Sequence, residues 1–337
     1  AYRAPASICP IYLRQATMAP ITITIDSKWL VVGAAAAASA VLVLRARAKM
    51  LTTIWWIRQH KRWVHAATKI EDLIVITDFD ATITSGDSEQ CHDMLGASKL
   101  MSSAFRKDFA PLLDWTTNAN IDGVEWWDAA HGFMVQHCMP PRQLIPRMVR
   151  EAKMMPRPGA LELLKKLETM DVPVLIVSAG VSDVIEEFLR QHGALSENVT
   201  ICSNRLNYEA DSAPKSVSPD PPITSFTKAY AYKSASSFFK AHENRRALIV
   251  LGDSVTDVDA CENVPSDRVL SVGFVNERPD AAAHAQAFDA VVVGDQGSLN
   301  AVIEIVDEIA PPPLTPMASI SRSFSRLGLS RSHSGRQ

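Results

Sequence analysis

The sequence lacks a CxxC pair, an internal repeat and an excess of charge of one sign, and each absence excludes a class of protein. Its cysteines are odd in number and widely spaced, so neither a disulfide framework nor a structural zinc site is expected, and reduced thiols inside a cell are favoured. They are Cys9, Cys91, Cys138, Cys202 and Cys261. Lys and Arg number 34 and Asp and Glu 37, and this balance offers no general attraction for a nucleic-acid polymer. Hydrophobic residues make up 47% of the 337, which excludes a wholly disordered chain.

An uncharged apolar stretch, WLVVGAAAAASAVLVL, is present at residues 29–44. It is a little shorter than the roughly 20 residues that span a bilayer core as a helix. Arg45, Arg47 and Lys49 follow it, and by the positive-inside tendency this flank and all later residues would stay in the cytosol. Three interpretations stay open: a signal-anchor helix, a transit or signal peptide, and a soluble Ala-rich helix.

The next segment, IWWIRQHKRWVHAATK, interleaves tryptophans with basic side chains. It suits a membrane interface, and it equally suits a helix that packs on the folded domain by its Trp face. Residues 29–66 are therefore a candidate membrane contact, and the catalytic domain is expected in the cytoplasm. At the other end, residues 311–337 are rich in Pro, Ser and Arg and have no apolar periodicity, which predicts a disordered tail.

Short apolar runs alternate with amphipathic stretches in the middle of the chain. The apolar runs predict buried strands, and the stretches between them predict helices. The strands are expected at 73–77, 172–177, 247–251, 269–275 and 290–293, and helices at 158–170 and 182–192. This alternation predicts an α/β fold with a doubly wound parallel sheet.

A long stretch separates the first two predicted strands, and much of it is predicted to be helical. The helices are expected at 92–107, 123–138 and 143–153. A helical cap inserted after the first strand explains this spacing. The predicted organisation is an N-terminal targeting segment at 1–67, an α/β core at 68–84 and 155–310, a cap at 85–154 and the tail at 311–337.

Polar and acidic residues follow three of the predicted strands. Asp78 and Asp80 come after the first, Ser178 after the second and Asp253 after the third. Parallel sheets bind ligands at the carboxyl ends of their strands, so these residues should meet at one edge. Neighbouring carboxylates raise each other's pKa unless a cation offsets the repulsion. Mg²⁺ is the natural cation for carboxylates that face a phosphate, and with Asp257 nearby the pattern predicts a phosphoryl-transfer site.

Four motifs resemble those of the haloacid-dehalogenase (HAD)-type phosphatases. They are DFDATIT at 78–84, VSAG at 177–180, Lys228 within ITSFTKAY and LGDSVTDVDA at 251–260. A lone DxD is often a solvated turn, but four motifs in the right order argue against coincidence. More narrowly, residues 69–310 resemble the cytosolic 5'-nucleotidase III, or pyrimidine 5'-nucleotidase, family. The phrases that carry this are the pair Cys91 and His92, EWWDAAHGFMVQ and PVLIVSAGVSDVIEEFLRQHG.

The resemblance implies a role for each matching acidic residue. Asp78 would be the nucleophile that takes up the phosphoryl group, forming an aspartyl-phosphate. Asp80 would be the general acid for the leaving ribose oxygen and then the base for water. Mg²⁺ would bind the Asp78 carboxylate, the Asp80 backbone carbonyl and Asp253, with Asp257 supporting these ligands.

The resemblance also implies which groups hold the phosphate. Its oxygens would contact Ser178, the amides of Ala179 and Gly180, and Lys228, while Thr82 would orient the nucleophile's loop. Two alternatives stay open. Ser178 could instead cap the helix that follows it, and Lys228 could be a solvated surface lysine.

The part of the cap that faces the nucleobase departs from the family pattern. Alignment by eye puts Leu112 where family members have a Glu and Ala130 where they have a Ser. Glu125 and Trp127 could rebuild the pocket from another angle. If two polar contacts are lost, discrimination between bases should be weak.

The leading hypothesis is therefore a Mg²⁺-dependent 5'-nucleotidase that hydrolyses nucleoside 5'-monophosphates, with pyrimidine nucleotides as the expected class. The first alternative is another small-phosphomonoester phosphatase of the HAD type. The second is a membrane-tethered, non-catalytic binding module, against which the intact set of acidic residues and lysine argues. The sequence leaves the preferred base and the oligomeric state open.

Overall fold

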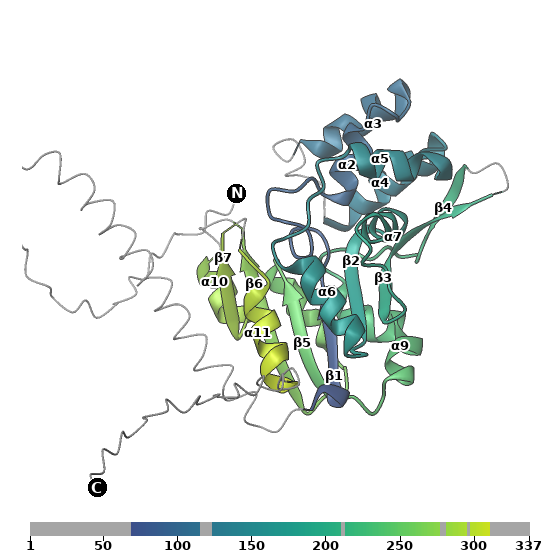
Figure 1. Ribbon diagram of the computed structural model, residues 1–337. Helices are drawn as coiled ribbons and strands as arrows, with labels where there is room; N and C mark the ends of the chain where they lie inside the picture. The colour runs from purple at the N-terminus through teal and green to yellow at the C-terminus, as the bar shows by residue number, and fades with distance from the viewer. Residues whose placement is uncertain (1–68, 115–122, 210–212, 277–280, 295–296, 311–337) are drawn as a thin grey trace, which may run out of the picture. The chain divides into compact units, whose positions relative to one another are not determined.

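One mixed sheet organises the part of the chain that the computed structural model describes, residues 69–114, 123–209, 213–276, 281–294 and 297–310 (Figure 1). Within these residues the sheet has seven strands in the order β4-β3-β2-β1-β5-β6-β7. All neighbours are parallel except β3 and β4, which pair antiparallel. The strands are β1 (Leu73–Thr77), β2 (Val174–Val181), β3 (Val199–Tyr208), β4 (Pro214–Ser218), β5 (Ala247–Gly252), β6 (Arg268–Val275) and β7 (Ala290–Val293).

Helices follow the strands on both faces of this sheet and also fill the interval between β1 and β2. They are α2 (Cys91–Ala97), α3 (Ser103–Leu113), α4 (Gly123–Gln136), α5 (Ile145–Glu151), α6 (Ala160–Thr169), α7 (Ser182–Gln191), α8 (Ala231–Ser234), α9 (Ser236–Ala241), α10 (Ala281–Ala287) and α11 (Asn300–Ile309). Short 3₁₀ turns are η2 (Ile70–Asp72), η4 (Arg142–Leu144), η5 (Lys228–Tyr230) and η6 (Val255–Cys261). The predicted α/β fold with a doubly wound, mostly parallel sheet is confirmed.

The apolar run of β1 is buried because the sheet is covered on both sides. Leu73 and Val75 belong to the cluster that packs under α6, α7 and α11, which Figure 1 shows on one face. Ile74 and Ile76 belong to a second cluster, with Phe238 and others of α9. Successive side chains of a strand point to opposite faces, so a strand covered on both faces must be apolar throughout.

The predicted strands at 73–77, 247–251, 269–275 and 290–293 are present within a residue or so of their expected ends, and the strand expected at 172–177 runs over Val174–Val181. The structure adds β3 and β4, which the sequence pattern did not predict. β3 is only partly buried and mixes polar with apolar residues. β4 begins with Pro214, a residue that an edge strand tolerates because one side of its backbone needs no partner.

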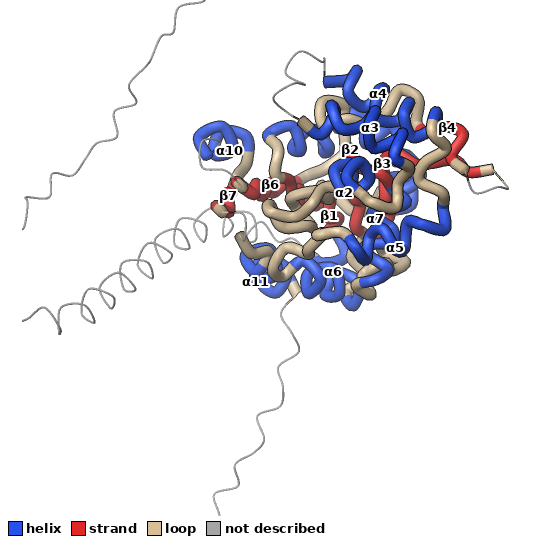
Figure 2. Tube along the Cα trace, turned by 90° about the horizontal axis from the view of Figure 1, so that it is seen from above, coloured by secondary structure: helices blue, strands red, loops and turns tan. Residues whose placement is uncertain are grey.

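Helices α2, α3, α4 and α5 lie between β1 and β2 in the chain and over the carboxyl ends of the strands in space (Figures 1 and 2). The prediction of one helix over 92–107 was wrong, since α2 ends at Ala97 and α3 begins at Ser103. Ser102 is the N-cap residue of α3 and explains why a new helix begins there. Its side chain accepts a hydrogen bond from the Phe105 amide at 3.1 Å.

The chain leaves and re-enters the core through two paired segments. The Ser85 amide donates to the Met155 carbonyl at 2.9 Å, and the Arg157 amide donates to the Ile83 carbonyl at 2.8 Å. This backbone pairing fixes the entry to α2–α5 relative to the exit from them.

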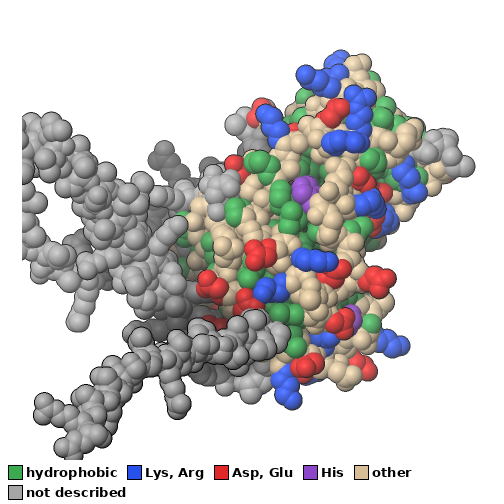
Figure 3. Space-filling view, in the orientation of Figure 1, with side chains coloured by type: hydrophobic (Ala, Val, Ile, Leu, Met, Phe, Trp, Pro, Cys, Tyr) green, Lys and Arg blue, Asp and Glu red, His purple; other side chains and the backbone are tan. Residues whose placement is uncertain are grey.

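The face seen in Figure 3 carries interspersed acidic and basic side chains, as a nearly balanced composition would predict. No helix among the described residues is both long and apolar enough to cross a membrane. The apolar stretch at 29–44, the aromatic and basic segment after it and the tail at 311–337 lie outside the described residues, so the interpretations given for them stay predictions.

Candidate active site

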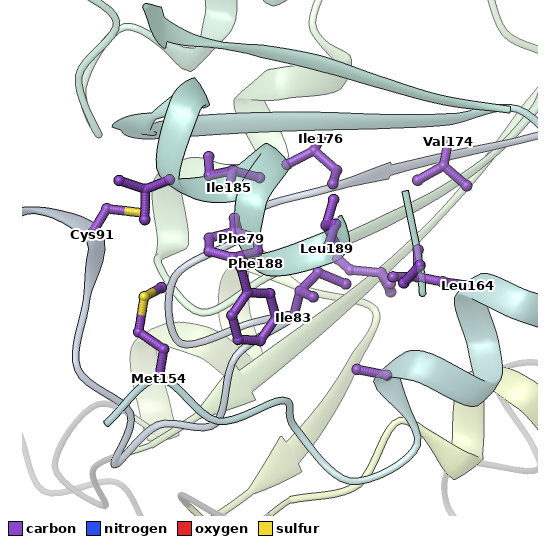
Figure 4. Close-up of a cluster of buried hydrophobic side chains, with 14 of the residues drawn as sticks. Phe79, Ile83, Cys91, Met154, Leu164, Val174, Ile176, Ile185, Phe188 and Leu189 are labelled. Carbon is purple, nitrogen blue, oxygen red and sulfur yellow. The ribbon is translucent and has the colours of Figure 1, made fainter. Parts of the chain in front are cut away.

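The first acidic loop begins directly after β1. Asp78 is 8% exposed, and its amide donates to the Leu251 carbonyl of β5 at 2.9 Å. The carboxylate of Asp80 accepts a hydrogen bond from the Cys91 amide, the first residue of α2, at 3.1 Å. Phe79 between the two acids is fully buried and packs edge-on against Phe188, as Figure 4 shows. The loop is therefore held by the sheet, by the hydrophobic cluster and by the start of α2 together.

Lys228 joins this loop to the second acidic loop. Its Nζ lies 2.7 Å from Asp78 Oδ1 and 2.5 Å from Asp257 Oδ1, and the lysine is only 4% exposed. Burial lowers the pKa of Lys228, but the carboxylates of Asp257 and Asp78 raise it by more, so it lies above its usual value. The ammonium group is thus charged and internal, which excludes the interpretation of Lys228 as a solvated surface lysine.

The carboxyl groups of the first loop have raised pKa values. Burial raises the pKa of Asp78, Lys228 lowers it and Asp257 raises it, with a result of about 6. Burial and then the charge of Asp78 raise the pKa of Asp80 to about 7, against the hydrogen bonds with Cys91. A group of pKa near 7 can donate and accept a proton at neutral pH, while one near 6 is mostly ionised there and can attack as a nucleophile.

The second acidic loop follows β5 and turns at once into η6. Gly252 permits the turn, because a Cβ there would lie 2.2 Å from the Cβ of Asp257. Ser254 and Asp257 form a capping box, in which the Ser254 amide donates to Asp257 Oδ2 at 2.8 Å. Both carboxylate oxygens of Asp257 are then engaged, one by this amide and one by Lys228.

Three carboxylates could hold a cation at this edge. One oxygen from each of Asp78, Asp253 and Asp257 lies within 4.8 Å of the others. Burial raises the pKa of Asp253 well above its usual value, and the charges of Asp78 and Asp257 raise it further. An all-oxygen donor set that is largely buried and short of positive charge fits Mg²⁺. Because Asp257 is already engaged, Asp78 and Asp253 are the carboxylates better placed to bind the metal.

Thr82 is fully buried and lies between the two acidic loops. Its hydroxyl donates to Asp253 Oδ1 at 3.5 Å. The side chain that was expected to orient the nucleophile's loop therefore contacts the second acidic loop.

Ser178, Ala179 and Gly180, here called the Ser178 loop, form the part of β2 near its carboxyl end where the pairing with β3 is irregular, and they lie beside the acidic residues. The Gly180 amide donates to Ser178 Oγ at 3.0 Å. The following helix, α7, begins at Ser182 with Val181 as its N-cap residue, so Ser178 does not cap it. Gly180 must be small, since a Cβ there would lie 2.9 Å from Cys91 Sγ and 3.1 Å from a carboxylate oxygen of Asp80.

A cavity of about 200 Å³ opens above these loops. Its floor contains the predicted acids and phosphate-binding groups, and its cap side contains aromatic rings. The lining residues are Asp78, Asp80, Gln90, His92, Asp93, Trp126, Trp127, Ser178, Ala179, Gly180, Ser225, Lys228, Asp253 and Ser254. The structure thus brings most of the predicted site residues to one cavity, with Thr82 and Asp257 directly behind it.

The aromatic side of the cavity is held by ring packing and hydrogen bonds. The rings of Trp126 and Trp127 pack edge-to-face with centroids 5.0 Å apart, and Trp127 Nε1 donates to the Ala179 carbonyl at 3.0 Å. His92 Nε2 lies 3.4 Å from His131 Nε2. Burial lowers the pKa of His92 to about 3, with a contribution from His131, and burial lowers that of His131 to about 4. Both imidazoles are therefore neutral at physiological pH.

The base-pocket interpretation of the cap needs correction. Leu112 is 4% exposed and Ala130 is fully buried, and both belong to the hydrophobic cluster. Neither these two residues nor Glu125 lines the cavity. Of the four residues considered, only Trp127 does, and Trp126 joins it. Positions in the interior of a cap helix bundle and positions at its cavity face cannot be told apart by alignment alone.

A supporting residue in β3 was not predicted from the sequence. The fully buried side-chain amide of Asn204, in β3, donates to the carbonyls of Ala179 at 2.9 Å and of Ile223 at 2.8 Å. It also accepts from the Ile223 amide at 2.9 Å. It ties the Ser178 loop to the segment that leads to Lys228. The available signal was a polar residue in a strand, but that strand was not predicted.

Comparison with known proteins points to one group. The sequence model of the pyrimidine 5'-nucleotidase (UMPH-1) family matches residues 79–310. The 7-methylguanosine phosphate-specific 5'-nucleotidase of Gallus gallus is 31% identical over 243 residues, which cover 66% of this chain and 83% of that protein. A putative cytosolic 5'-nucleotidase 3 of Caenorhabditis elegans is 28% identical, over 70% of this chain and 69% of that protein.

A solved structure is similar in fold. The crystal structure of cytosolic 5'-nucleotidase IIIB bound to cytidine superposes with a TM-score of 0.62 at 22% identity. The match covers 75% of this chain and 89% of that chain.

Proposed function

Because the chain belongs to the pyrimidine 5'-nucleotidase family, we propose that it hydrolyses nucleoside 5'-monophosphates, pyrimidine nucleotides among them, through an aspartyl-phosphate on Asp78. The observation that carries the proposal is a single cavity in which Asp78, Asp80, Asp253 and Lys228 meet beneath two tryptophans. The floor supplies a nucleophile, a group for acid and base catalysis and a positive charge. The roof supplies an apolar surface for a nucleobase.

The reaction proceeds in two displacements. An oxygen of the Asp78 carboxylate attacks phosphorus, the bond from phosphorus to the ribose 5'-oxygen breaks, and Asp80 donates its proton to that oxygen as the nucleoside leaves. Water then attacks phosphorus and gives its proton to Asp80, the bond to Asp78 breaks, and phosphate leaves. The pKa of Asp80, about 7, suits both proton transfers.

Mg²⁺, when bound, would neutralise charge on the phosphoryl oxygens. Asp78, Asp253 and the Asp80 backbone carbonyl are the proposed ligands, and Asp257 holds Lys228 beside them. Lys228 and the Ser178 loop would hold the phosphate oxygens. For the Gly180 amide this means exchanging the Ser178 hydroxyl for a phosphate oxygen.

The proposal is tested with the full chain, Mg²⁺ and a panel of monophosphates with matched sugar phosphates. Asp78→Asn should abolish turnover without unfolding the chain, because it removes the attacking oxygen and hardly changes the side-chain volume. Asp80→Asn should be slow and should accumulate a phosphorylated chain, visible by intact-mass spectrometry. Release of phosphate from sugar phosphates but not from nucleotides would favour the alternative, a different small-phosphomonoester phosphatase.

A second candidate substrate is 7-methylguanosine 5'-monophosphate. The relative from Gallus gallus is named for that phosphate, and a purine methylated at N7 carries a positive charge that indole rings attract. Trp126 and Trp127 at the roof of the cavity favour such a base. The test is the kcat/KM of the methylated nucleotide against that of GMP, which lacks the N7 methyl group and its positive charge. Equal values would exclude this candidate.

We also propose the division into a core at 68–84 and 155–310 and a cap at 85–154, which is supported by the position of α2–α5 between β1 and β2. A cytoplasmic location of the catalytic part is supported by the name of the Caenorhabditis elegans relative. Its association with a membrane through residues 29–66 stays a prediction.

A further inference from the structure

A charged side chain that the proposed chemistry does not use is buried where the cap joins the core. Arg157 is 1% exposed, and it follows the segment that pairs with the entry to the cap. Burying a guanidinium is costly unless its N–H groups find partners. An arginine in this position therefore has a structural or functional reason.

Arg157 contacts two neighbouring carbonyls of the first acidic loop and two acceptors elsewhere in the chain. Nε donates to the Thr82 carbonyl at 2.9 Å, and Nη2 donates to the Ala81 carbonyl and to Asn276 Oδ1, the latter at 2.8 Å. Nη1 donates to the Gly297 carbonyl at 2.9 Å. Two consecutive carbonyls of the loop are thus held by one rigid, planar group.

The loop needs this support because Ala81 has an unfavourable backbone conformation. Its φ is +56°, in the left-handed region that disfavours residues with a Cβ. The Ala81 amide donates to Thr84 Oγ1 at 2.8 Å, and its carbonyl accepts from Arg157 and from Asn276 Nδ2, at 3.2 Å in the latter case. The torsions of Ala81 orient the peptide that joins it to Asp80, and so the Asp80 carbonyl.

Asn276 extends the contact to the second acidic loop. It follows β6 directly, and its Nδ2 lies 3.4 Å from Asp253 Oδ2 as well as near the Ala81 carbonyl. Gly86 makes room for it, because a Cβ at Gly86 would lie 2.3 Å from Asn276 Oδ1. Arg157, Asn276 and the two acidic loops therefore form one continuous set of hydrogen bonds.

We propose that Arg157 and Asn276 are positioning residues, which hold the Ala81 peptide and the Asp253 carboxylate so that Asp80 and the metal-binding oxygens keep their relative placement. Neither side chain lines the cavity, so they act through other residues. The inference rests on the roles proposed above for Asp80 and Asp253. The competing explanation is a brace that stabilises the fold and leaves the chemistry untouched.

The test uses two variants and a matched control in the full chain. Arg157→Lys keeps the charge, but a single nitrogen cannot serve three backbone carbonyls and the side-chain oxygen of Asn276 in the same geometry. Asn276→Leu removes the contact with Asp253 at similar volume. The control is Arg245→Lys, because Arg245 also donates to backbone carbonyls, those of Ile70 and Leu73, but at the opposite end of β1.

We expect kcat of Arg157→Lys to fall roughly 10- to 100-fold with KM for the nucleotide changed less than about threefold, since small misplacements of reacting groups have effects of this size. Asn276→Leu should raise the Mg²⁺ concentration for half-maximal activity about tenfold or more, by the same misplacement of a ligand. Without any substrate, the rise in melting temperature on adding Mg²⁺ should shrink in Asn276→Leu. Arg245→Lys should lower the melting temperature and change neither kinetic value.

Variants that lose stability like the control but keep wild-type kcat and Mg²⁺ response would overturn the positioning role. If Arg157→Lys does not fold, Asn276→Leu decides by the same two measurements. A wild-type chain that gains stability from Mg²⁺ but hydrolyses no nucleotide would refute the proposed function instead. In that case the rise in melting temperature of Asn276→Leu on adding Mg²⁺, compared with that of wild type, would still test the positioning role.

Discussion

Replacing Asp80 by Asn should make the protein more stable at neutral and alkaline pH while removing its activity. In the folded chain the pKa of Asp80 is raised from 3.8 to about 7, by burial first and by the charge of Asp78 second. Between these two values the unfolded chain has lost a proton that the folded chain keeps. The unfolded state therefore binds fewer protons, and stability must fall as the pH rises from about 4 to about 7.

The size of the effect follows from the two pKa values. Their difference corresponds to about 4 kcal/mol of folding free energy. The wild-type protein loses this contribution as Asp80 ionises, and the loss is complete above pH 7. Asparagine cannot ionise, and its side-chain oxygen can still accept the hydrogen bond from the Cys91 amide. For a folded unit of this size, 4 kcal/mol is roughly 8–16 °C in melting temperature.

The assay is thermal unfolding of wild type and Asp80→Asn in EDTA, so that bound metal does not offset the charge, at intervals from pH 4.5 to pH 8.5. The two curves should lie close together at the acid end and diverge as the pH rises. Glu162→Gln, on the exposed side of α6, is the control and should run parallel to wild type throughout. If the Asp80→Asn curve also runs parallel to that of wild type, the pKa of Asp80 is not raised in the folded protein. The argument for Asp80 as proton donor at neutral pH would then fail.

Two further predictions concern the metal and the N-terminal segment. Activity should vanish in EDTA and return with Mg²⁺, and Asp253→Ala should raise the Mg²⁺ needed for half-maximal activity or abolish the response; full activity in EDTA would exclude the proposed ligand set. A fluorescent reporter fused to residues 1–67 should sediment with membranes, because the stretch at 29–44 is apolar and followed by basic residues; a reporter that stays in the soluble fraction would rule out the anchor.

The floor of the cavity was predictable because the positions of its residues follow from short-range rules. β1 and β5 are apolar runs covered on both faces, and their carboxyl ends must meet at one edge. Asp78 and Asp253 follow those ends, so their proximity could be inferred without tertiary detail. The family resemblance inferred from the motifs is confirmed by the match over residues 79–310.

What surrounds the floor depends on contacts that local patterns do not encode. Asn276 also follows a predicted strand, so the rule that selected Asp253 could have selected it. No local pattern marked Arg157, because the carbonyls to which it donates hydrogen bonds belong to residues 75 and 140 positions away in the sequence. Asn204 was hidden with β3, whose partly exposed residues mix polar and apolar types.

The residues at the roof of the cavity also could not be identified from the sequence alone. For Leu112 the structure leads to a prediction opposite to the one from the alignment. If Leu112 faced the base, Leu112→Glu would sharpen the preference for pyrimidines. In the structure Leu112 packs inside the cap, and its carbonyl accepts from Trp126 Nε1 at 3.0 Å. A carboxyl group at this position would be buried without a compensating hydrogen-bond partner, which would lower the free energy of unfolding by several kcal/mol.

We therefore expect Leu112→Glu to lower the melting temperature by roughly 6–16 °C, on a loss of about 3–4 kcal/mol, and to leave the ratio of kcat/KM for CMP and GMP within about twofold of wild type. Leu112→Met, which conserves volume, is the control and should change neither quantity much. The selectivity of wild type would then come from the residues that line the cavity, with Trp126, Trp127 and His92 on its cap side. A Leu112→Glu enzyme that keeps its stability and gains tenfold or more in favour of CMP would show that this side chain reaches the base, and that the packing of α3 against α4 opens in the working enzyme.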